Sequence, residues 1–474
     1  MPLILTPFRF FNFRIWCGAN LVSTTGTWMQ VLAANWLLLT LTGSAMRMGL
    51  GVVMNAVPIL LLAPLGGALA DRLRPRPLLT VTQVLHVLIA LALALVASAE
   101  GDVTWWVYGA LLAGGVVTAV ESPAVGRFGS TMVDRDHLGP ALAVGSVAGS
   151  AGRIVGMSVG GGLIATAGPA PAFLVNAATF LVVIAALYLL RPATPGAVEE
   201  APGPAAAAAE AADGSVPTGV WQGMRYVLRD PVVVITLALA FLLGSLGRNY
   251  NVTMAAMSAG PLAGGADAYG MLSTVFAVGA VVGGLFSARA GKMYGRHLVA
   301  VGGAMSLLQL LSGLAPSLWT FAAMMFPIAT AAVVVDTVVS TRLQLDQPLA
   351  VRGRVLAAVG TTGAVSGAVG APALGWLADT LGPRSALLLA GAVTTLGCVA
   401  AGFAYAAVRR RRVTVAAAPR SARPPAPVPR ARLARSGDEA GDGAGDAVVV
   451  GARRADPSTP EGEREPARRP APET

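Results

Sequence analysis

Long apolar runs, each separated from the next by a short polar segment, occupy most of the first 408 residues. A helix needs about 20 mostly apolar residues to cross the hydrocarbon core of a bilayer. Twelve runs are long enough, at 15–40, 46–70, 78–98, 103–125, 140–166, 171–190, 231–256, 268–289, 297–314, 318–341, 355–378 and 384–408. The pattern therefore predicts an all-α membrane protein with twelve transmembrane helices.

The two halves of the chain repeat one plan at an offset of about 220 residues. Three features of the first half recur in the second. The segment 70–78 corresponds to 290–298, and the turn 167–169 corresponds to 381–383. The acid–arginine pair Glu121 and Arg127 corresponds to Asp336 and Arg342. Duplicated helix bundles are typical of secondary transporters, whose substrate site lies between the halves. We expect two pseudo-symmetric six-helix bundles around such a site.

The polar segments define four regions. We expect an N-terminal bundle at 1–190, a linker at 191–230, a C-terminal bundle at 231–408 and a tail at 409–474. The linker is rich in proline and alanine, which is typical of a flexible connection. The tail is rich in Pro, Ala and Arg with few large apolar residues, so we expect it to be disordered.

Arginines concentrate in alternate loops, including Arg72, Arg74 and Arg76 in one loop and Arg352 and Arg354 in another. Because positive charge stays on the cytoplasmic side of a membrane, this bias predicts that both termini are cytoplasmic. An even number of helices requires the same arrangement. The excess of Arg, Ala and Gly is typical of a GC-rich bacterial genome, so we expect the bacterial cytoplasmic membrane, with both termini inside.

Composition excludes several other classes. The chain is 55% hydrophobic and 12% charged, against about 25% charged in soluble proteins. Its net charge of +10 comes with no basic face carrying interleaved aromatics, so we expect no nucleic-acid partner. No phosphate-binding loop or hydrolase motif is present, which argues against an enzyme. His86, His137 and His297 are widely separated, so we expect no metal, and nothing indicates another cofactor.

The loop after the second predicted helix carries a recognisable motif. Its residues Gly67-Ala-Leu-Ala-Asp71-Arg72-Leu-Arg-Pro-Arg76 resemble the major facilitator signature between the second and third helices. Matching segments occur at 26–30, 225–231 and 352–355, and together they are similar to the branch that includes the enterobactin exporter and macrolide efflux proteins. The resemblance covers about residues 8–408. It implies a central cavity lined by the first, fourth, seventh and tenth helices, worked by alternating access.

Polar residues fall on the helices that this resemblance assigns to the cavity. Gln30 and Asn35 lie on the first predicted helix, and Arg248 and Asn251 on the seventh. Ionisable groups cost about 2.5–3.5 kcal/mol at the centre of a bilayer, so they tend to face a cavity or a partner. We expect these four residues to contact substrate. For Arg248 the alternative is that it extends to the membrane interface.

Two carboxylates, Glu121 and Asp336, lie within the fourth and tenth predicted helices. Arg127 follows Glu121 by six residues, about 240° round a helix, so the two cannot easily pair on one face. We expect Glu121 to pair with Arg72 or Arg76 and, by symmetry, Asp336 to pair with Lys292 or Arg296. The pairs either lock the cytoplasmic gate or include the group that carries a coupling proton.

Two further residues have alternative interpretations. Asp71 ends the second helix, where the resemblance implies that it caps a neighbouring helix and contributes to gating. Arg153, on the fifth helix, either binds an anionic substrate or pairs with Glu121. We expect it to act with Glu121 and Asp336 in coupling or gating.

Taken together, the sequence predicts a monomeric, proton-driven exporter of small amphipathic molecules such as a drug, an antibiotic or a siderophore-like metabolite. Two other classes remain open at this point: a lipid flippase or importer on the same fold, and a non-transporting membrane sensor.

Overall fold

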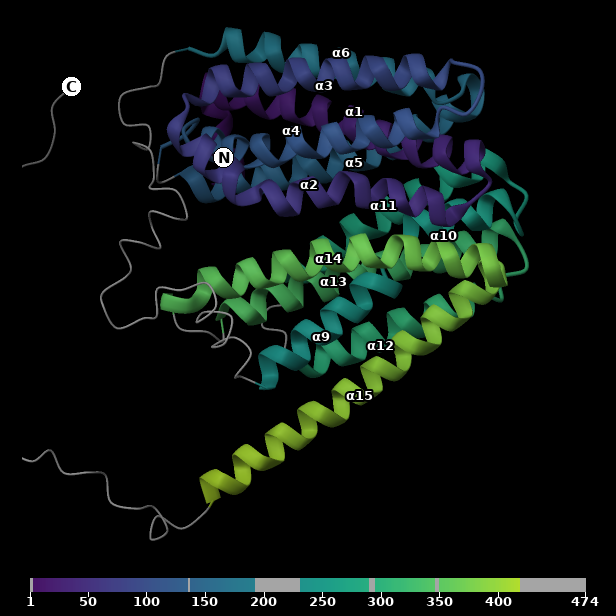
Figure 1. Cartoon of the computed structure of the whole chain (residues 1–474). Coiled ribbons are helices and arrows are strands. Elements are labelled where there is room, and N and C mark those ends of the chain that lie inside the picture. Colours follow the sequence, from purple (N-terminus) through teal and green to yellow (C-terminus); the bar gives the residue numbers. More distant parts are fainter. Residues whose placement is uncertain (1–2, 135–136, 192–230, 290–294, 346–348, 418–474) are drawn as a thin grey trace, which may run out of the picture. The chain divides into compact units, whose positions relative to one another are not determined.

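The computed structural model describes residues 3–134, 137–191, 231–289, 295–345 and 349–417, which are helical throughout with short connections and, in these ranges, contain no strand (Figure 1). After the 3₁₀ helix η1 (Leu3–Arg9), the helices are α1 (Phe11–Thr42), α2 (Ala45–Arg72), α3 (Pro75–Ala97), α4 (Thr104–Ser130), α5 (Leu138–Ala167), α6 (Ala170–Leu189), α9 (Pro231–Leu246), α10 (Tyr250–Ala259), α11 (Gly265–Arg289), α12 (Gly295–Ser312), α13 (Leu318–Leu345), α14 (Leu349–Leu381) and α15 (Pro383–Ala417). Most of the predicted linker and tail, at 192–230 and 418–474, lies outside the described residues.

These helices form the twelve predicted spans, with α9 and α10 together making the seventh. Within the described residues, nine segments are long and apolar enough to be recognised as spans by composition alone. The other three are α1, α12 and α14. α12 is only 18 residues long, and α14 is rich in glycine and alanine, which lowers its hydropathy. The predicted all-α membrane fold is confirmed.

The two halves use the same set of helix pairs. In the first half, α1 packs on α5 and α6, α2 packs on α4, and α3 packs on α4 and α6. In the second half, α9 packs on α14 and α15, α11 packs on α13, and α12 packs on α13 and α15. Each pair in one half has its counterpart in the other when the helices are matched in chain order. The two pseudo-symmetric six-helix bundles expected from the repeat are therefore confirmed.

Successive spans run in opposite directions, so the ends of the helices lie at two faces of the molecule. We call the end where α1 begins and α2 ends the terminal face, and the end where α1 ends and α2 begins the opposite face. The halves meet mainly where α2 packs on α14 and α5 packs on α11. Close backbone approaches in both pairs lie toward the ends of these helices at the opposite face, such as Gly49 with Ala371 and Gly161 with Gly270.

Two of these approaches require glycine. A Cβ on Gly161 would collide with the backbone of Gly270, and a Cβ on Gly49 would collide with the backbone of Ala371. Small residues let helix backbones approach closely inside a membrane, where packing rather than the hydrophobic effect drives helix association. The glycines thus allow the two halves to close on each other at the opposite face.

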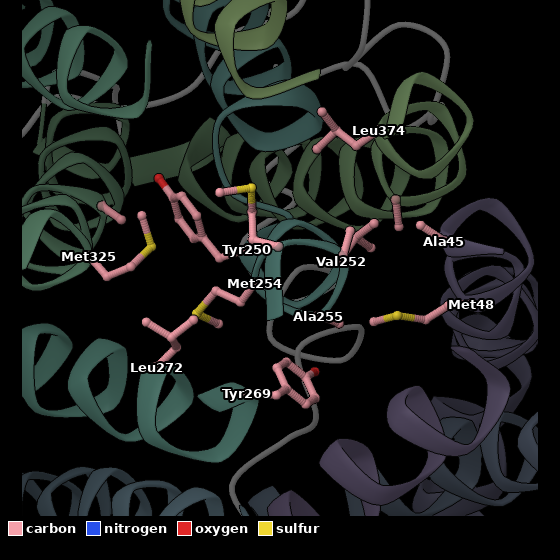
Figure 2. Close-up of a cluster of buried hydrophobic side chains, with 14 of the residues drawn as sticks. Ala45, Met48, Tyr250, Val252, Met254, Ala255, Tyr269, Leu272, Met325 and Leu374 are labelled. Atoms are coloured by element: carbon pink, nitrogen blue, oxygen red, sulfur yellow. The ribbon is translucent and has the colours of Figure 1, made fainter. Parts of the chain in front are cut away.

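The apolar core also joins the halves at this face. One buried cluster includes Ala45 and Met48 of α2, Val252 and Ala255 of α10, and Leu374 of α14 (Figure 2). A second cluster lies toward the terminal face and draws, among the described residues, only on the first half, with Trp16 and Phe128 in edge-to-face contact. The described contacts therefore hold the halves together at the opposite face.

Aromatic residues mark the opposite face on the outside of the bundles. Trp105 and Trp106 lie in the first turn of α4, and Trp319 lies in the first turn of its counterpart α13. Their side chains have exposed fractions of 78, 72 and 74%. Tryptophan is enriched at membrane interfaces because its ring is apolar and its N–H is polar. In the loop before α4, hydrogen bonding from Thr104 lowers the pKa of the Asp102 carboxyl, so a negative charge persists beside the N-terminus of α4.

One helix end differs from the sequence prediction. α15 continues to Ala417, nine residues beyond the predicted end at 408. Arginine and alanine are good helix formers, and cations near a helix C-terminus interact favourably with its dipole. The arginine-rich start of the predicted tail therefore prolongs the last helix.

Candidate functional site

The seventh span is interrupted near its middle. α9 ends at Leu246 and α10 begins at Tyr250, so Arg248 lies in the break. A broken helix leaves carbonyl groups without helical partners, and these must find other donors inside a membrane. The Nε2 of Gln309 donates to the Leu246 carbonyl at 2.8 Å, and the Nδ2 of Asn249 donates to the Ser245 carbonyl at 2.8 Å. The break is thus stabilised by side chains, as in transporters that bind ligands at discontinuous helices.

Arg248 reaches from this break to α13, where its guanidinium forms an ion pair and hydrogen bond with Asp336. The two side chains have exposed fractions of 34 and 47%, although neighbouring Val335 and Val338 are buried. The pair therefore borders water-accessible space within the bundle. The sequence predicted Lys292 or Arg296 as the partner of Asp336. Lys292 and the side chain of Arg296 lie outside the described part of the chain. The partner that the structure shows is Arg248.

Glu121 faces α3. Its Oε2 lies 2.7 Å from the Nε2 of His86, and its Oε1 accepts a hydrogen bond from Gln83. His86 stacks on the ring of Phe180 at a centroid distance of 5.0 Å. The prediction that Arg72 or Arg76 would pair with Glu121 is wrong. Gln83 and His86 are one turn apart on α3, so they present both polar groups to α4 together.

The signature loop makes its own contacts at the terminal face. The Nη1 of Arg127 lies 2.8 Å from the Oδ1 of Asp71 and also donates to the Ala70 carbonyl at 2.6 Å. Arg76 donates to the Arg191 carbonyl at 2.8 Å, and Arg72 is exposed at the end of α2. Asp71 was expected to cap a neighbouring helix; the contact that the structure shows links α2 to α4 within one half.

An acid at the opposite face forms a contact between the halves. Asp379, near the end of α14, accepts hydrogen bonds from the Ser44 hydroxyl at 2.5 Å and from the backbone N–H groups of Ala45 and Met46 at 2.8 and 3.0 Å. It thereby caps the N-terminus of α2, where a negative charge is favourable. The predicted span 355–378 ends just before Asp379. A serine just before an apolar run, such as Ser44, can mark a helix N-cap, but here its partner lies 335 residues away.

The predicted substrate contacts are not gathered at one point. Gln30 accepts a hydrogen bond from the Nδ2 of Asn176 at 2.8 Å, which turns its amide toward α6. Asn35 is buried, with an exposed fraction of 6%. Arg248 and Asn251, by contrast, belong to the break and the first turn of α10. The structure therefore brings Arg248 to the neighbouring span α13, with Asn251 three residues further along the chain in the first turn of α10.

A cavity of about 370 Å³ opens among α1, α4 and α5 in the terminal half of the first bundle. Its lining is mostly apolar, with Phe13, Trp16 and Leu142 as the largest residues and Asn20 and Thr24 among the polar ones. Arg153 lies one turn beyond the lining residue Gly149 on α5, and its Cζ is 5.7 Å from the ring centroid of Trp28. Ligand sites in proteins are of this kind, with an apolar wall and a few polar groups.

Comparisons with solved structures support the fold. The nucleoside transporter NupG matches with a TM-score of 0.66 at 12% identity, covering 85% of this chain and 99% of that one. A bacterial homologue of the human lysosomal transporter Spinster, inward-facing and unoccupied, matches with a TM-score of 0.63 at 14% identity, covering 85 and 96%. A D-xylose–proton symporter matches with a TM-score of 0.63 at 14% identity, covering 82 and 96%. At these identities the likeness shows the fold alone.

The sequence comparisons identify the family. The uncharacterized MFS-type transporter YfiS of Bacillus subtilis (strain 168) is 25% identical over 174 residues, which is 36% of this chain. The match spans 40% of that relative's length. The family described as transmembrane secretion effector matches over residues 4–437, nearly the whole chain. The chain is therefore a membrane transporter of the major facilitator type and belongs to the transmembrane secretion effector family.

Proposed function

We propose that this transporter is a proton-coupled exporter of small amphipathic molecules that works by alternating access as a monomer in the bacterial cytoplasmic membrane. The bundles 1–190 and 231–408 are its two moving parts, and the terminal face is the cytoplasmic one. The substrate is a small molecule of the drug, antibiotic or siderophore-like kind, and the working partners are protons and the lipid bilayer.

One observation supports alternating access most strongly. Described close approaches between the halves, such as Gly49 with Ala371 and Gly161 with Gly270, lie toward the opposite face, while the cavity of the first bundle opens in its terminal half. Close contacts at one face and a cavity toward the other support an inward-facing state of the transporter. An exporter in this state takes substrate from the cytoplasm and releases it after the bundles rock.

Proton coupling is supported by the groups around Glu121. Glu121 of α4 and His86 of α3 form a carboxylate–imidazole contact between two spans, and such a contact can pass a proton between its two groups. Asp336 with Arg248 is the second candidate, since a carboxylate paired with an arginine can release it on protonation. Asp71, Arg72, Arg76, Lys292 and Arg296 belong to gating on this proposal, as groups at the ends of the cytoplasmic spans.

The test begins by comparing small molecules in the medium and cytoplasm of the source strain with and without the gene. A compound that disappears outside and accumulates inside names the exported substrate. Purified protein in liposomes should then move that compound when a pH gradient is imposed. An unchanged profile together with no gradient-driven flux would contradict export. If both Glu121→Gln and Asp336→Asn leave gradient-driven flux unchanged, the coupling assignment is wrong.

A further inference from the structure

Arg153 lies one helical turn beyond the lining of the cavity, on the side away from the terminal face. On α5 it follows the lining residue Gly149 by one turn, and on α1 Trp28 follows the lining residue Thr24 by one turn. Residues one turn apart share a helix face, so Arg153 and Trp28 continue the two walls of the cavity inward from the terminal face. Gly152 and Gly156 allow α5 to lie close against α1 beside Arg153, because a Cβ on either would meet a backbone carbonyl oxygen of α1.

The guanidinium of Arg153 has spare hydrogen-bonding capacity. Its Nε is buried and has no hydrogen-bond partner, and among the described residues no carboxylate lies within ion-pair distance of it. Glu121, the alternative partner suggested by the sequence, is bonded to Gln83 and His86 on α3. A buried donor without an acceptor is costly and in native structures often marks a functional site.

Among the described residues, the charges near Arg153 leave a positive excess. Asp336, on α13, is the described carboxylate whose field reaches Arg153, and it is already bonded to Arg248. Two guanidinium groups thus share one carboxylate. None of the residues that line the cavity is charged. One added negative charge beside Arg153 would balance the group and satisfy its open donor.

Resting on the proposed transport function, we propose that this cavity is the substrate site and that it selects amphipathic monoanions, with the anionic group on Arg153 and an aromatic body beside Trp28 and the apolar walls. A carboxylate accepts charge-assisted hydrogen bonds from a guanidinium. The aromatic part lies along α1 toward Trp16 and Phe13. A cavity of about 370 Å³ is within the range of small-molecule sites, about 300–1,000 Å³.

Three probes of nearly equal shape test the charge preference: 2-naphthoate, the neutral 2-naphthamide and the cationic 2-naphthylmethylammonium. Binding to the full chain in lipid nanodiscs is measured by calorimetry, with empty nanodiscs subtracted. We expect naphthoate to bind about tenfold or more tightly than the amide, a difference that one charge-assisted contact readily gives. Equal binding of naphthoate and naphthamide would overturn the proposal.

Variants then assign the preference to the arginine. Arg153→Gln should lower naphthoate affinity about tenfold and leave naphthamide affinity within about twofold, and Arg153→Lys should fall between. Arg47→Gln, at the opposite face, removes the same charge far from the cavity and should change neither affinity. If Arg153→Gln keeps the preference for naphthoate, Arg153 is not the anion site.

A second variant tests the cavity without touching the arginine. A Cβ on Gly149 would meet nothing within 4 Å, so Gly149→Leu should fold and place its side chain in the cavity. We expect it to abolish binding of naphthoate and naphthamide alike, and unchanged binding would overturn the cavity assignment.

Flux measurements separate this inference from the proposed function. Transport of neutral or cationic molecules without any preference for the carboxylate would refute the anion site and leave the exporter proposal standing. Tight naphthoate binding that depends on Arg153, without flux under any gradient, would refute the exporter proposal and leave the site standing.

Discussion

At the scale of single residues, the most informative contact is the one between Glu121 and His86. The pair joins α3 to α4 inside one bundle, with an imidazole 2.7 Å from a carboxylate oxygen and Gln83 on the other oxygen. The site is separate from the Arg248–Asp336 pair, which belongs to the other half. Each half thus contains a carboxylate in the interior of a span, Glu121 in α4 and Asp336 in α13, that is bonded to a side chain of another span.

Glu121→Gln should uncouple transport from the proton gradient. The amide keeps the shape of the side chain but cannot take up or release a proton near neutral pH. We expect gradient-driven accumulation of the exported compound in liposomes to be lost, while exchange of labelled for unlabelled compound continues, since exchange needs no net proton movement. Glu100→Gln, which alters an exposed acid in the loop after α3, is the matched control and should behave like the parent protein. Full gradient-driven accumulation by Glu121→Gln would contradict the coupling role.

Asn249 and Asn251 follow Arg248 closely in the sequence, but substitutions at the two positions should differ in their effect on thermal stability. Asn249→Ala removes the donor that satisfies the carbonyls of Ser245 and Gly244 at the end of α9, at a cost of about 1–3 kcal/mol per unsatisfied buried group. We expect a clearly lower midpoint of thermal unfolding in detergent. Asn251→Ala, two residues on, should leave that midpoint nearly unchanged. Equal thermal effects of the two substitutions would argue against the capping role of Asn249.

At the scale of helices, the contact between α5 and α11 depends on one glycine pair. Gly161→Val would bring its side chain against the backbone of Gly270, whereas Gly162→Val, on the next position, meets nothing within 4 Å. Overpacking of this kind costs about 1–3 kcal/mol. We expect Gly161→Val to lower the thermal midpoint and to weaken closure of the opposite face, and Gly162→Val to change neither. Both substitutions add a β-branched residue to the same helix. If Gly161→Val and Gly162→Val lowered the thermal midpoint equally, close packing against Gly270 would not be the cause.

The sequence predicted the helices better than the contacts between them. Span positions follow from hydropathy, and the symmetry of the halves follows from the repeat, because both are local or periodic properties. The partner of Glu121 was missed because an arginine was expected for a buried acid, although Gln83 and His86 were the unusual polar residues of an otherwise apolar helix. The break at 247–249 was missed because the apolar run continues on both sides of it. Asp379 was missed because its partners lie in the other half of the chain.

For the whole molecule, the contact between Asp379 and the N-terminus of α2 holds the two halves together at the opposite face. Its three hydrogen bonds must break before that face can open. Asp71 and Arg127 hold the other end of α2 within its own bundle. The same helix is therefore fixed to its own half at the terminal face and to the partner half at the opposite face.

Asp379→Asn should shift the molecule toward opening at the opposite face. Hydrogen bonds to a charged group contribute about 1.5–3 kcal/mol, so loss of the charge should raise the open population by about tenfold or more. Spin labels at Leu41 and Leu381, exposed positions at the ends of α1 and α14, would report the change as a longer distance between the halves.

Asp267→Asn provides the control for that substitution. Asp267 is an exposed acid in the first turn of α11 on the same face, so its neutralisation changes the surface charge equally without touching α2. An identical distance distribution for Asp379→Asn and the parent protein would show that the capping contact does not hold the face closed.

The tryptophans in the first turns of α4 and α13 link the protein to the thickness of the bilayer around it. Because these are equivalent helices in the two halves, Trp105 and Trp319 anchor both bundles to one lipid leaflet at one depth. In the proposed alternating-access mechanism, rocking would swing the ends of the helices at the terminal face through the other leaflet, which would have to thin or thicken to follow them. The lipid chain length of the membrane thereby becomes part of the energy landscape of transport, and turnover should pass through an optimum as acyl chains are lengthened.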